Sequence, residues 1–199
     1  MKKILFSSTI AIFALVAFSF KSSAPENILI QKGSVLVYDI NTTNSSYTIT
    51  TTVMGTAEEL HLHLSFTDAA KTETDLIMNA ASLENSHKQL TYFTSGEMKP
   101  TDALGVYFSK QMMNELGYGK SYVYLDNNNT PTPLVKLGIE DMPVSINDNI
   151  LNVSVIHAKE PSYNGKTNLA EYWILNNADC PIILKMKTDF SLQIKGIHL

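Results

Sequence analysis

The chain has 199 residues and a formal charge of −4 at pH 7, with 15 lysines and arginines against 19 aspartates and glutamates. This length is enough for one domain with a sizeable hydrophobic core. An acidic chain without a basic run repels phosphate groups, so we expect neither nucleic acid nor an anionic lipid surface as a partner. The single cysteine, Cys180, cannot form an internal disulfide, so stability must come from the burial of apolar side chains.

The start of the chain has the pattern of a secretory signal peptide, residues 1–24. The charged segment Met1–Lys3 precedes a mostly apolar stretch, and Ser22–Ala24 resembles a cleavage site with small residues. Cleavage after Ser19 is an alternative, because Pro25 would directly follow the first site. Retention as an uncleaved anchor is a second alternative, although the apolar stretch is short for a bilayer span.

The mature part, residues 25–199, is expected to be a single β-rich domain. Loss of three lysines and no acid with the signal peptide takes its formal charge to −7. No other segment is long and apolar enough to span a membrane, so we expect no integral membrane span after signal removal. We expect an exported protein that is periplasmic, associated with the outer membrane or extracellular.

Most of the mature chain has strand patterns. The clearest is residues 60–66, where four apolar side chains alternate with polar ones and therefore share one face. A loop is expected over residues 126–133, because its two prolines exclude it from a central strand. The predicted strands are residues 34–40, 47–54, 60–66, 72–78, 121–125, 134–139 (a brief pairing), 149–158, 171–175 and 182–194.

Helical patterns are few. Residues 109–116 are the best candidate, with Ser109 as N-cap and Gly117 as a stop. Residues 80–90 have a weaker helical pattern, and residues 96–100 are expected to be irregular. The predicted fold is therefore mainly β: a single, strongly curved antiparallel sheet or open barrel packed against one or two helices.

The C-terminal part is expected to carry much of the core. Residues 171–175 and 182–194 are rich in branched and aromatic residues and flank a run of turn formers, residues 176–181. We expect a hairpin that closes the sheet. Glu171 shares a strand face with Trp173, so we expect a partly buried acid that pairs with a lysine.

The weak candidates for a metal site are His61, His63 and His157. His61 and His63 are two apart on one strand, so their imidazoles point the same way and could bind one metal ion. His157 would be a third ligand if its strand neighbours residues 60–66. The alternative is that His61 and His63 lie on the solvent face of a half-buried strand and that His157 lies at the edge of the core.

The surroundings of this pair partly resemble the first metal motif of the cupin family, in which a glycine precedes His-x-His and a glutamate follows. Gly55 stands at the glycine position, whereas Asp68 replaces the glutamate and Asp75 replaces a second glycine. The motifs of serine hydrolases, aspartic proteases, zinc proteases and nucleotide-binding proteins are missing from the sequence. We therefore expect no catalytic residues, no cofactor-binding residues and no cofactor.

The stretch of residues 171–185 is similar to the ending of exported bacterial β-proteins of the DUF3108 family and the related TapB-type proteins. Residues 33–38 and residues 109–116 also fit that pattern, whereas Cys180 departs from the usual asparagine before the proline. The resemblance implies an envelope domain with a curved sheet like that of lipoprotein carriers. It implies no catalytic residues.

The functional prediction is an exported, non-enzymatic envelope domain that binds a lipid-like apolar ligand or an envelope protein. One alternative is a cupin-like metal-binding protein that uses His61 and His63. Another alternative is a structural subunit of a surface assembly.

Overall fold

The structure is a computed structural model and describes residues 28–55, 59–67, 72–125, 130–161 and 169–199. The predicted signal peptide lies outside the described residues, as do Asp68 and residues 126–129 of the predicted loop.

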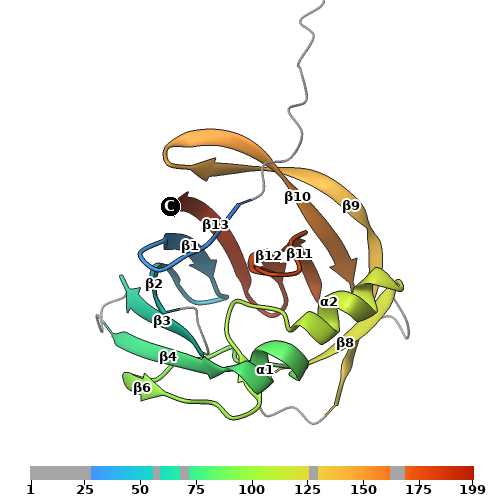
Figure 1. Ribbon diagram of the computed structural model, residues 1–199, viewed down its shortest axis with the longest axis horizontal. Coiled ribbons are helices and arrows are strands. Elements are labelled where there is room, and N and C mark those ends of the chain that lie inside the picture. Colours follow the sequence, from blue (N-terminus) through green and yellow to red (C-terminus); the bar gives the residue numbers. More distant parts are fainter. Residues whose placement is uncertain (1–27, 56–58, 68–71, 126–129, 162–168) are drawn as a thin grey trace, which may run out of the picture.

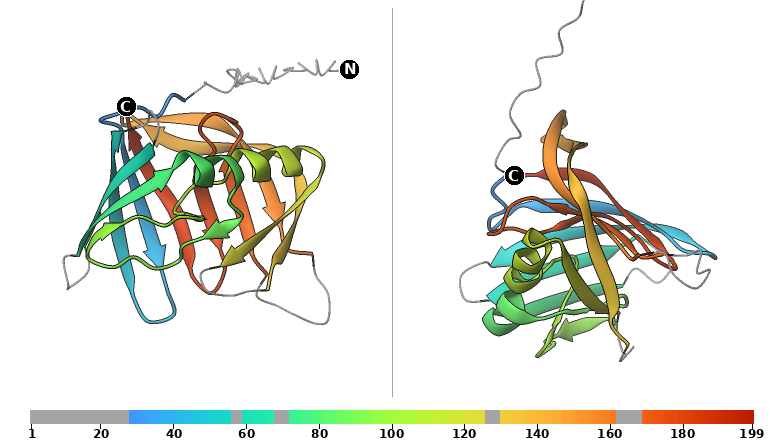
Figure 2. Two further views of the ribbon diagram at one scale, coloured as in Figure 1. Left: turned by 60° about the horizontal axis from the view of Figure 1, so that its bottom comes forward. Right: turned by 90° about the vertical axis from the view of Figure 1, so that its right-hand side faces the viewer.

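The protein is mainly β, as predicted: thirteen strands form one large, strongly curved sheet with two short helices inside the curve (Figures 1 and 2). Most neighbouring strands are antiparallel. The strands follow the order β6-β4-β3-β2-β1-β13-β12-β11-β10-β9-β8-β5-β7. Their bounds are β1 Val35–Asn41, β2 Ser46–Gly55, β3 Glu59–Phe66, β4 Glu73–Asn79, β5 Lys88–Gln89, β6 Gly96–Met98, β7 Ala103–Leu104, β8 Lys120–Leu125, β9 Thr132–Ile146, β10 Asn149–Lys159, β11 Glu171–Leu175, β12 Ile183–Lys187 and β13 Ser191–His198.

The C-terminal strands lie in the middle of the sheet. The run predicted as one long strand divides into β12 and β13 around Thr188, whose backbone N–H donates to Phe190 O at 2.8 Å. β13 pairs with β1, so the last strand joins the two halves of the sheet. The predicted hairpin therefore lies within the sheet, because β13 pairs with β1 on one side and β11 pairs with β10 on the other.

β9 and β10 form a hairpin much longer than the predicted brief pairing. Asn147 and Asp148 form its turn at φ 48° and 64°, the left-handed region that two-residue hairpin loops require. Pro133 lies inside β9, contrary to prediction, near the strand's beginning, where a missing N–H is tolerated. At the other end Ile146 bridges to Ile197 of β13, so strands β9–β13 make a partial ring.

Both helices are capped by side chains. Helix α2 (Lys110–Gly117) follows Ser109, whose Oγ accepts a hydrogen bond from Met112 N at 3.1 Å, so the predicted N-cap is confirmed. Helix α1 (Ala80–Asn85) is shorter than predicted and is capped by Asn79. Figure 2 shows both helices lying inside the curve of the sheet. Neither helix reaches the length or apolar character needed to cross a bilayer, and the described part of the chain has no other helix.

The alternation predicted for β3 is confirmed. Leu62 and Leu64 are 2% and 1% exposed, whereas His61 and His63, which alternate with them, are half-buried on the opposite face. Each such leucine contributes about 1.5–3 kcal/mol on burial, which fixes the register of the strand. The largest fully buried side chains are Tyr38, Tyr172, Phe108, Leu36, Leu64, Leu76, Met78, Leu104, Met112, Leu116, Leu134 and Ile174.

Residues 86–108, here called the crossing segment, connect α1 to α2 and contain β5, β6 and β7. The segment is held by backbone hydrogen bonds between distant residues: Leu90 N donates to Leu104 O at 2.7 Å, and Ile183 N donates to Val106 O at 3.0 Å. β6 is a short edge strand parallel to β4 where irregular chain was expected. A Cβ atom at Gly105 would lie 2.7 Å from Leu76 Cδ2, so any larger residue here would require the buried Leu76 side chain to shift.

Candidate functional site

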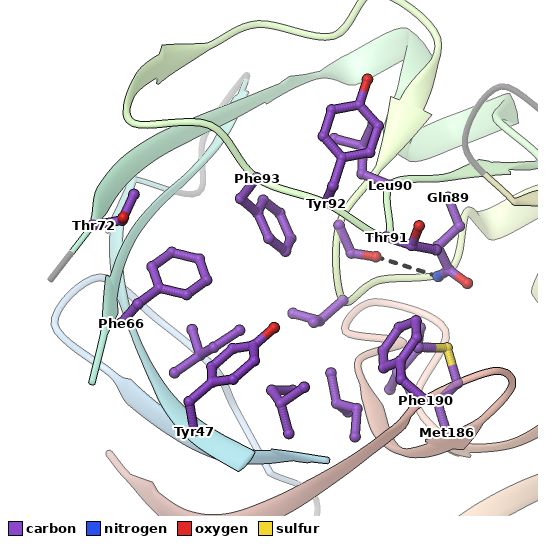
Figure 3. A pocket seen from close by; sticks show the side chains of 16 residues that line it. Tyr47, Phe66, Thr72, Gln89, Leu90, Thr91, Tyr92, Phe93, Met186 and Phe190 are labelled. Atoms are coloured by element: carbon purple, nitrogen blue, oxygen red, sulfur yellow. Dashed lines mark hydrogen bonds between the residues drawn. The ribbon is translucent and has the colours of Figure 1, made fainter. Parts of the chain in front are cut away.

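A cavity of about 260 Å³ lies between the concave face of the sheet and the crossing segment (Figure 3). Its walls come from β1, β2, β3, β12 and β13 on the sheet side. Residues 89–93 and 105–106 of the crossing segment line the opposite side. Segments distant in the sequence therefore enclose one space, and the curvature of the sheet is what creates it.

Aromatic rings form one wall of this cavity. Phe66 lies between Tyr47 and Phe93, with ring centroids 6.3 Å and 5.9 Å away, and both ring pairs are tilted, at 39° and 50°. Figure 3 shows these three rings on one side of the space and Phe190 beside Met186 on the other. Such a lining favours an apolar occupant over water.

The described lining residues include no charged side chain. Their most deeply buried polar side chain is Gln89 on β5, which is 3% exposed. Its Nε2 donates to Gly105 O and to Tyr107 O, both at 3.2 Å. Its Oε1 is buried and has no hydrogen-bond partner among the described residues. A buried acceptor in this state is unusual in a folded protein.

A second cavity of about 290 Å³ lies nearer the helices. Val106 of the crossing segment lines both cavities and therefore separates them. Charged side chains surround the second cavity: Lys110 Nζ lies 3.4 Å from Glu84 Oε2, and Asp179 also lines it. Because its lining mixes charges with leucines, the second cavity is less suited to a purely apolar occupant.

His61 and His63 do lie side by side on the outer face of the sheet, the face away from the helices. His61 Nε2 is 3.2 Å and His63 Nδ1 is 3.0 Å from the same oxygen, Asp75 Oδ1 on β4. Hydrogen bonds from His63 and His61 lower the pKa of Asp75. One nitrogen of each ring thus already has a partner, and the described residues contain no group of three or more histidines, cysteines or acids arranged to hold a metal ion. A metal site at this pair stays a prediction.

The structure does not bring His157 to this pair. Its strand, β10, is separated from β3 by five strands of the sheet. His157 Nε2 instead bonds Glu171 Oε1 at 2.9 Å, and its ring stacks on Trp173 at a centroid distance of 4.4 Å. The reading of His157 as a satisfied residue at the edge of the core is therefore confirmed.

Glu171 pairs with lysines, as predicted, in addition to His157. Lys159 Nζ and Lys187 Nζ lie 3.8 Å and 3.9 Å from its carboxylate oxygens. Lys185 Nζ lies 4.5 Å from the centre of the Trp173 ring, a cation–π distance. This cluster links β10, β11 and β12 on the outer face. We assign it a role in holding these three strands together.

Another histidine pairs with an acid beside helix α2. His87 Nε2 lies 2.8 Å from Glu115 Oε2, and the imidazole stacks on Tyr122 at 4.2 Å. Burial acts to raise the pKa of Glu115, but hydrogen bonds from Ser121, His87 and Gln111 outweigh it, so this pKa lies below its ordinary value.

Cys180 is buried, with 5% of its surface exposed. Burial raises the pKa of its thiol, which disfavours the reactive thiolate. Cys180 therefore acts here as a small core residue.

Sequence reasoning missed the cavity because its residues carry no local pattern. Gln89 falls in the predicted weak helix, and Phe93 falls between predicted elements. The adjacent aromatic residues Tyr92 and Phe93 are the sequence signal that could have pointed to this segment.

The comparisons with known proteins do not add a family to this geometry. No family model matches the chain, and neither a curated protein nor a solved structure matches it significantly.

Proposed function

We propose that this chain is an exported envelope domain that binds a small, lipid-like apolar molecule in the cavity between the sheet and the crossing segment. Export rests on the signal-peptide pattern of residues 1–24. Membership of the DUF3108 group is part of the proposal and rests on the ending of the chain, residues 171–185.

The cavity is the single observation that carries this proposal. It has a volume of about 260 Å³, an aromatic and aliphatic lining, and no charged side chain among the described residues that line it. An apolar cavity of about 150 Å³ binds benzene, so this one suits roughly ten non-hydrogen atoms by proportion. That size matches a short chain or one ring, and it excludes a complete phospholipid.

The test uses two leucines that each line only one cavity. Leu90 lines the aromatic cavity and Leu83 lines the second cavity, and both are partly buried against the core. Leu90→Trp would place an indole in the proposed site, whereas Leu83→Trp is a matched control that fills the other space. Overpacking costs about 1–3 kcal/mol at either position, so both variants are first checked for cooperative unfolding.

The probes are nonanol and its isomer methyl octyl ether, titrated into the purified chain by calorimetry. We expect at least one isomer to bind the wild type and Leu83→Trp alike, and to bind Leu90→Trp at least tenfold more weakly. Failure of both isomers to bind the wild type would refute the proposal. So would equal binding by the Leu90→Trp variant.

A second candidate function, a subunit of a surface assembly, is favoured by one observation. Leu137, Ile139 and Ile150 on the β9–β10 hairpin are 59%, 56% and 70% exposed, which is high for large apolar side chains. We propose a second copy of the chain as the occupant of this surface.

Sedimentation velocity over a range of concentrations tests the second candidate. Self-association of the wild type should be lost when Leu137 and Ile139 are both changed to lysine. It should persist when Tyr118, which is 90% exposed at the end of α2, is changed to lysine instead. If the wild type stays monomeric at every concentration, the proposal of a surface assembly is refuted.

A further inference from the structure

The lining of the aromatic cavity distinguishes between kinds of apolar group. Tyr47, Phe66 and Phe93 form one side of the space, here called the ring wall. Phe190 and Met186 lie together on the other side, here called the methionine side (Figure 3). A straight chain would use both sides only as apolar surface, whereas an aromatic ring would also interact with them through its π-system.

The ring wall is assembled from three separate parts of the chain. Tyr47 lies on β2, Phe66 ends β3, and Phe93 belongs to the crossing segment. The centroid of the Phe66 ring lies 6.3 Å from that of Tyr47 and 5.9 Å from that of Phe93, within the range of about 4.5–7 Å for favourable ring pairs. A further ring placed in the cavity beside Phe66 would continue this cluster at the same spacing.

The methionine side suits a ring as well. Met186 lies on β12, and a thioether sulfur makes favourable contacts with the edge of an aromatic ring. Phe190, which lies between β12 and β13, adds one more ring on this side. Phe66 and Met186 are both buried in the core, so the two sides are held in place by packing before a ligand arrives.

We propose that the ligand carries one aromatic ring, which lies between the ring wall and the methionine side. This inference rests on the proposed function and names the ligand class of the same cavity. The volume of about 260 Å³ suits a six-membered ring with a short substituent. The part of the ligand inside the cavity is uncharged, because the described lining residues carry no charge that would compensate a buried ion.

Phenylpropyl alcohol and cyclohexylpropyl alcohol test this inference by calorimetry on the wild type. They share one skeleton of about ten non-hydrogen atoms and one hydroxyl group, and differ only in the saturation of the ring. The saturated ring removes more apolar surface from water, so a site that responded to apolar area alone would bind the cyclohexyl compound more tightly. We expect the opposite order, with the phenyl compound bound more tightly by a factor of about three or more.

The variant Phe66→Leu assigns this preference to the ring wall. Leucine keeps an apolar side chain but removes the middle ring, so the preference for the phenyl compound should disappear or invert. Phe108→Leu is the matched control, because the Phe108 ring packs against Tyr172 at 5.4 Å and does not line the cavity. The control should keep the preference. Both variants are first checked for cooperative unfolding, and the comparison of the two alcohols on the wild type needs neither of them.

The outcomes separate this inference from the proposed function. Equal or tighter binding of the cyclohexyl compound, lost in Leu90→Trp, overturns the aromatic inference and leaves the apolar site in place. A preference for the phenyl compound that is unchanged in Phe66→Leu has the same consequence, as does binding of nonanol without binding of either ring compound. Failure of nonanol, methyl octyl ether and both ring compounds to bind overturns the inference and the proposed function together.

Discussion

The protein should become more stable when either of two buried tyrosines loses its hydroxyl group. Tyr38 and Tyr172 are 0% exposed, and neither hydroxyl has a hydrogen-bond partner in the described structure. Burial raises the pKa of both phenols, so both stay uncharged at neutral pH. An unsatisfied buried hydroxyl costs about 1–3 kcal/mol, and phenylalanine keeps the ring and its packing. We therefore expect Tyr38→Phe and Tyr172→Phe each to raise the free energy of unfolding by about 1 kcal/mol.

Urea unfolding followed by circular dichroism measures the change, and a domain of this size should gain about 2–4 °C in Tm per kcal/mol. Tyr107→Phe is the matched control, because the Tyr107 hydroxyl donates to Asp179 O at 3.4 Å. That variant should lose about 1 kcal/mol instead. A loss of 1 kcal/mol or more in Tyr38→Phe and Tyr172→Phe would show that both hydroxyls are paired, and the reasoning would fail.

Four further substitutions test the local structure. Ser109→Ala removes the N-cap of α2 and should cost about 1 kcal/mol in urea unfolding, and an unchanged midpoint would show that the cap contributes nothing. Gly105→Ala, whose Cβ meets a buried leucine, should cost about 1–3 kcal/mol, whereas Gly117→Ala, in open space within α2, should add about 0.5–1 kcal/mol. Equal effects of these two changes would contradict the packing described for the crossing segment. The pKa of Glu115 is lowered in the folded state. The stability that Glu115 contributes is therefore present when the pH is above 4.5, the ordinary pKa of a glutamate, and is lost as the pH falls below it. The stability advantage of the wild type over Glu115→Gln should therefore narrow below about pH 4.5, and a pH-independent difference would refute this assignment.

Local patterns predicted the parts of the fold that local physics determines. The period-two alternation of β3 gave its buried face because one residue of slippage would expose every leucine in it. Helix α2 was predicted from its cap and its apolar spacing, and both are present in the structure. The curvature of the sheet and its two helices were also predicted.

The crossing segment was not predicted because nothing local specifies it. Its position depends on backbone hydrogen bonds to residues far away in the sequence, such as the bond from Ile183 N to Val106 O. Its strands are two or three residues long, too short for any periodicity. The crossing segment forms one wall of the cavity, so the candidate site could not be predicted from the sequence for the same reason.

The hairpin of β9 and β10 was underestimated for a different reason. The prolines near its start suggested a loop, and the turn at Asn147 and Asp148 was not recognised, although both residue types tolerate a positive φ. The pairing of His61 and His63 with Asp75 likewise needed the neighbouring strand β4, since sequence separation alone cannot show which carboxylate faces them.

The central claim, that the aromatic cavity is the binding site, is tested most directly by NMR of the protein labelled with ¹³C at its methionine methyl groups. Met186 lines this cavity, whereas Met112 lies in α2 and Met142 in β9, and neither lines it. Titration with nonanol should shift the Met186 methyl resonance and leave those of Met112 and Met142 in place. A Met186 resonance that does not move at saturating nonanol would contradict the account.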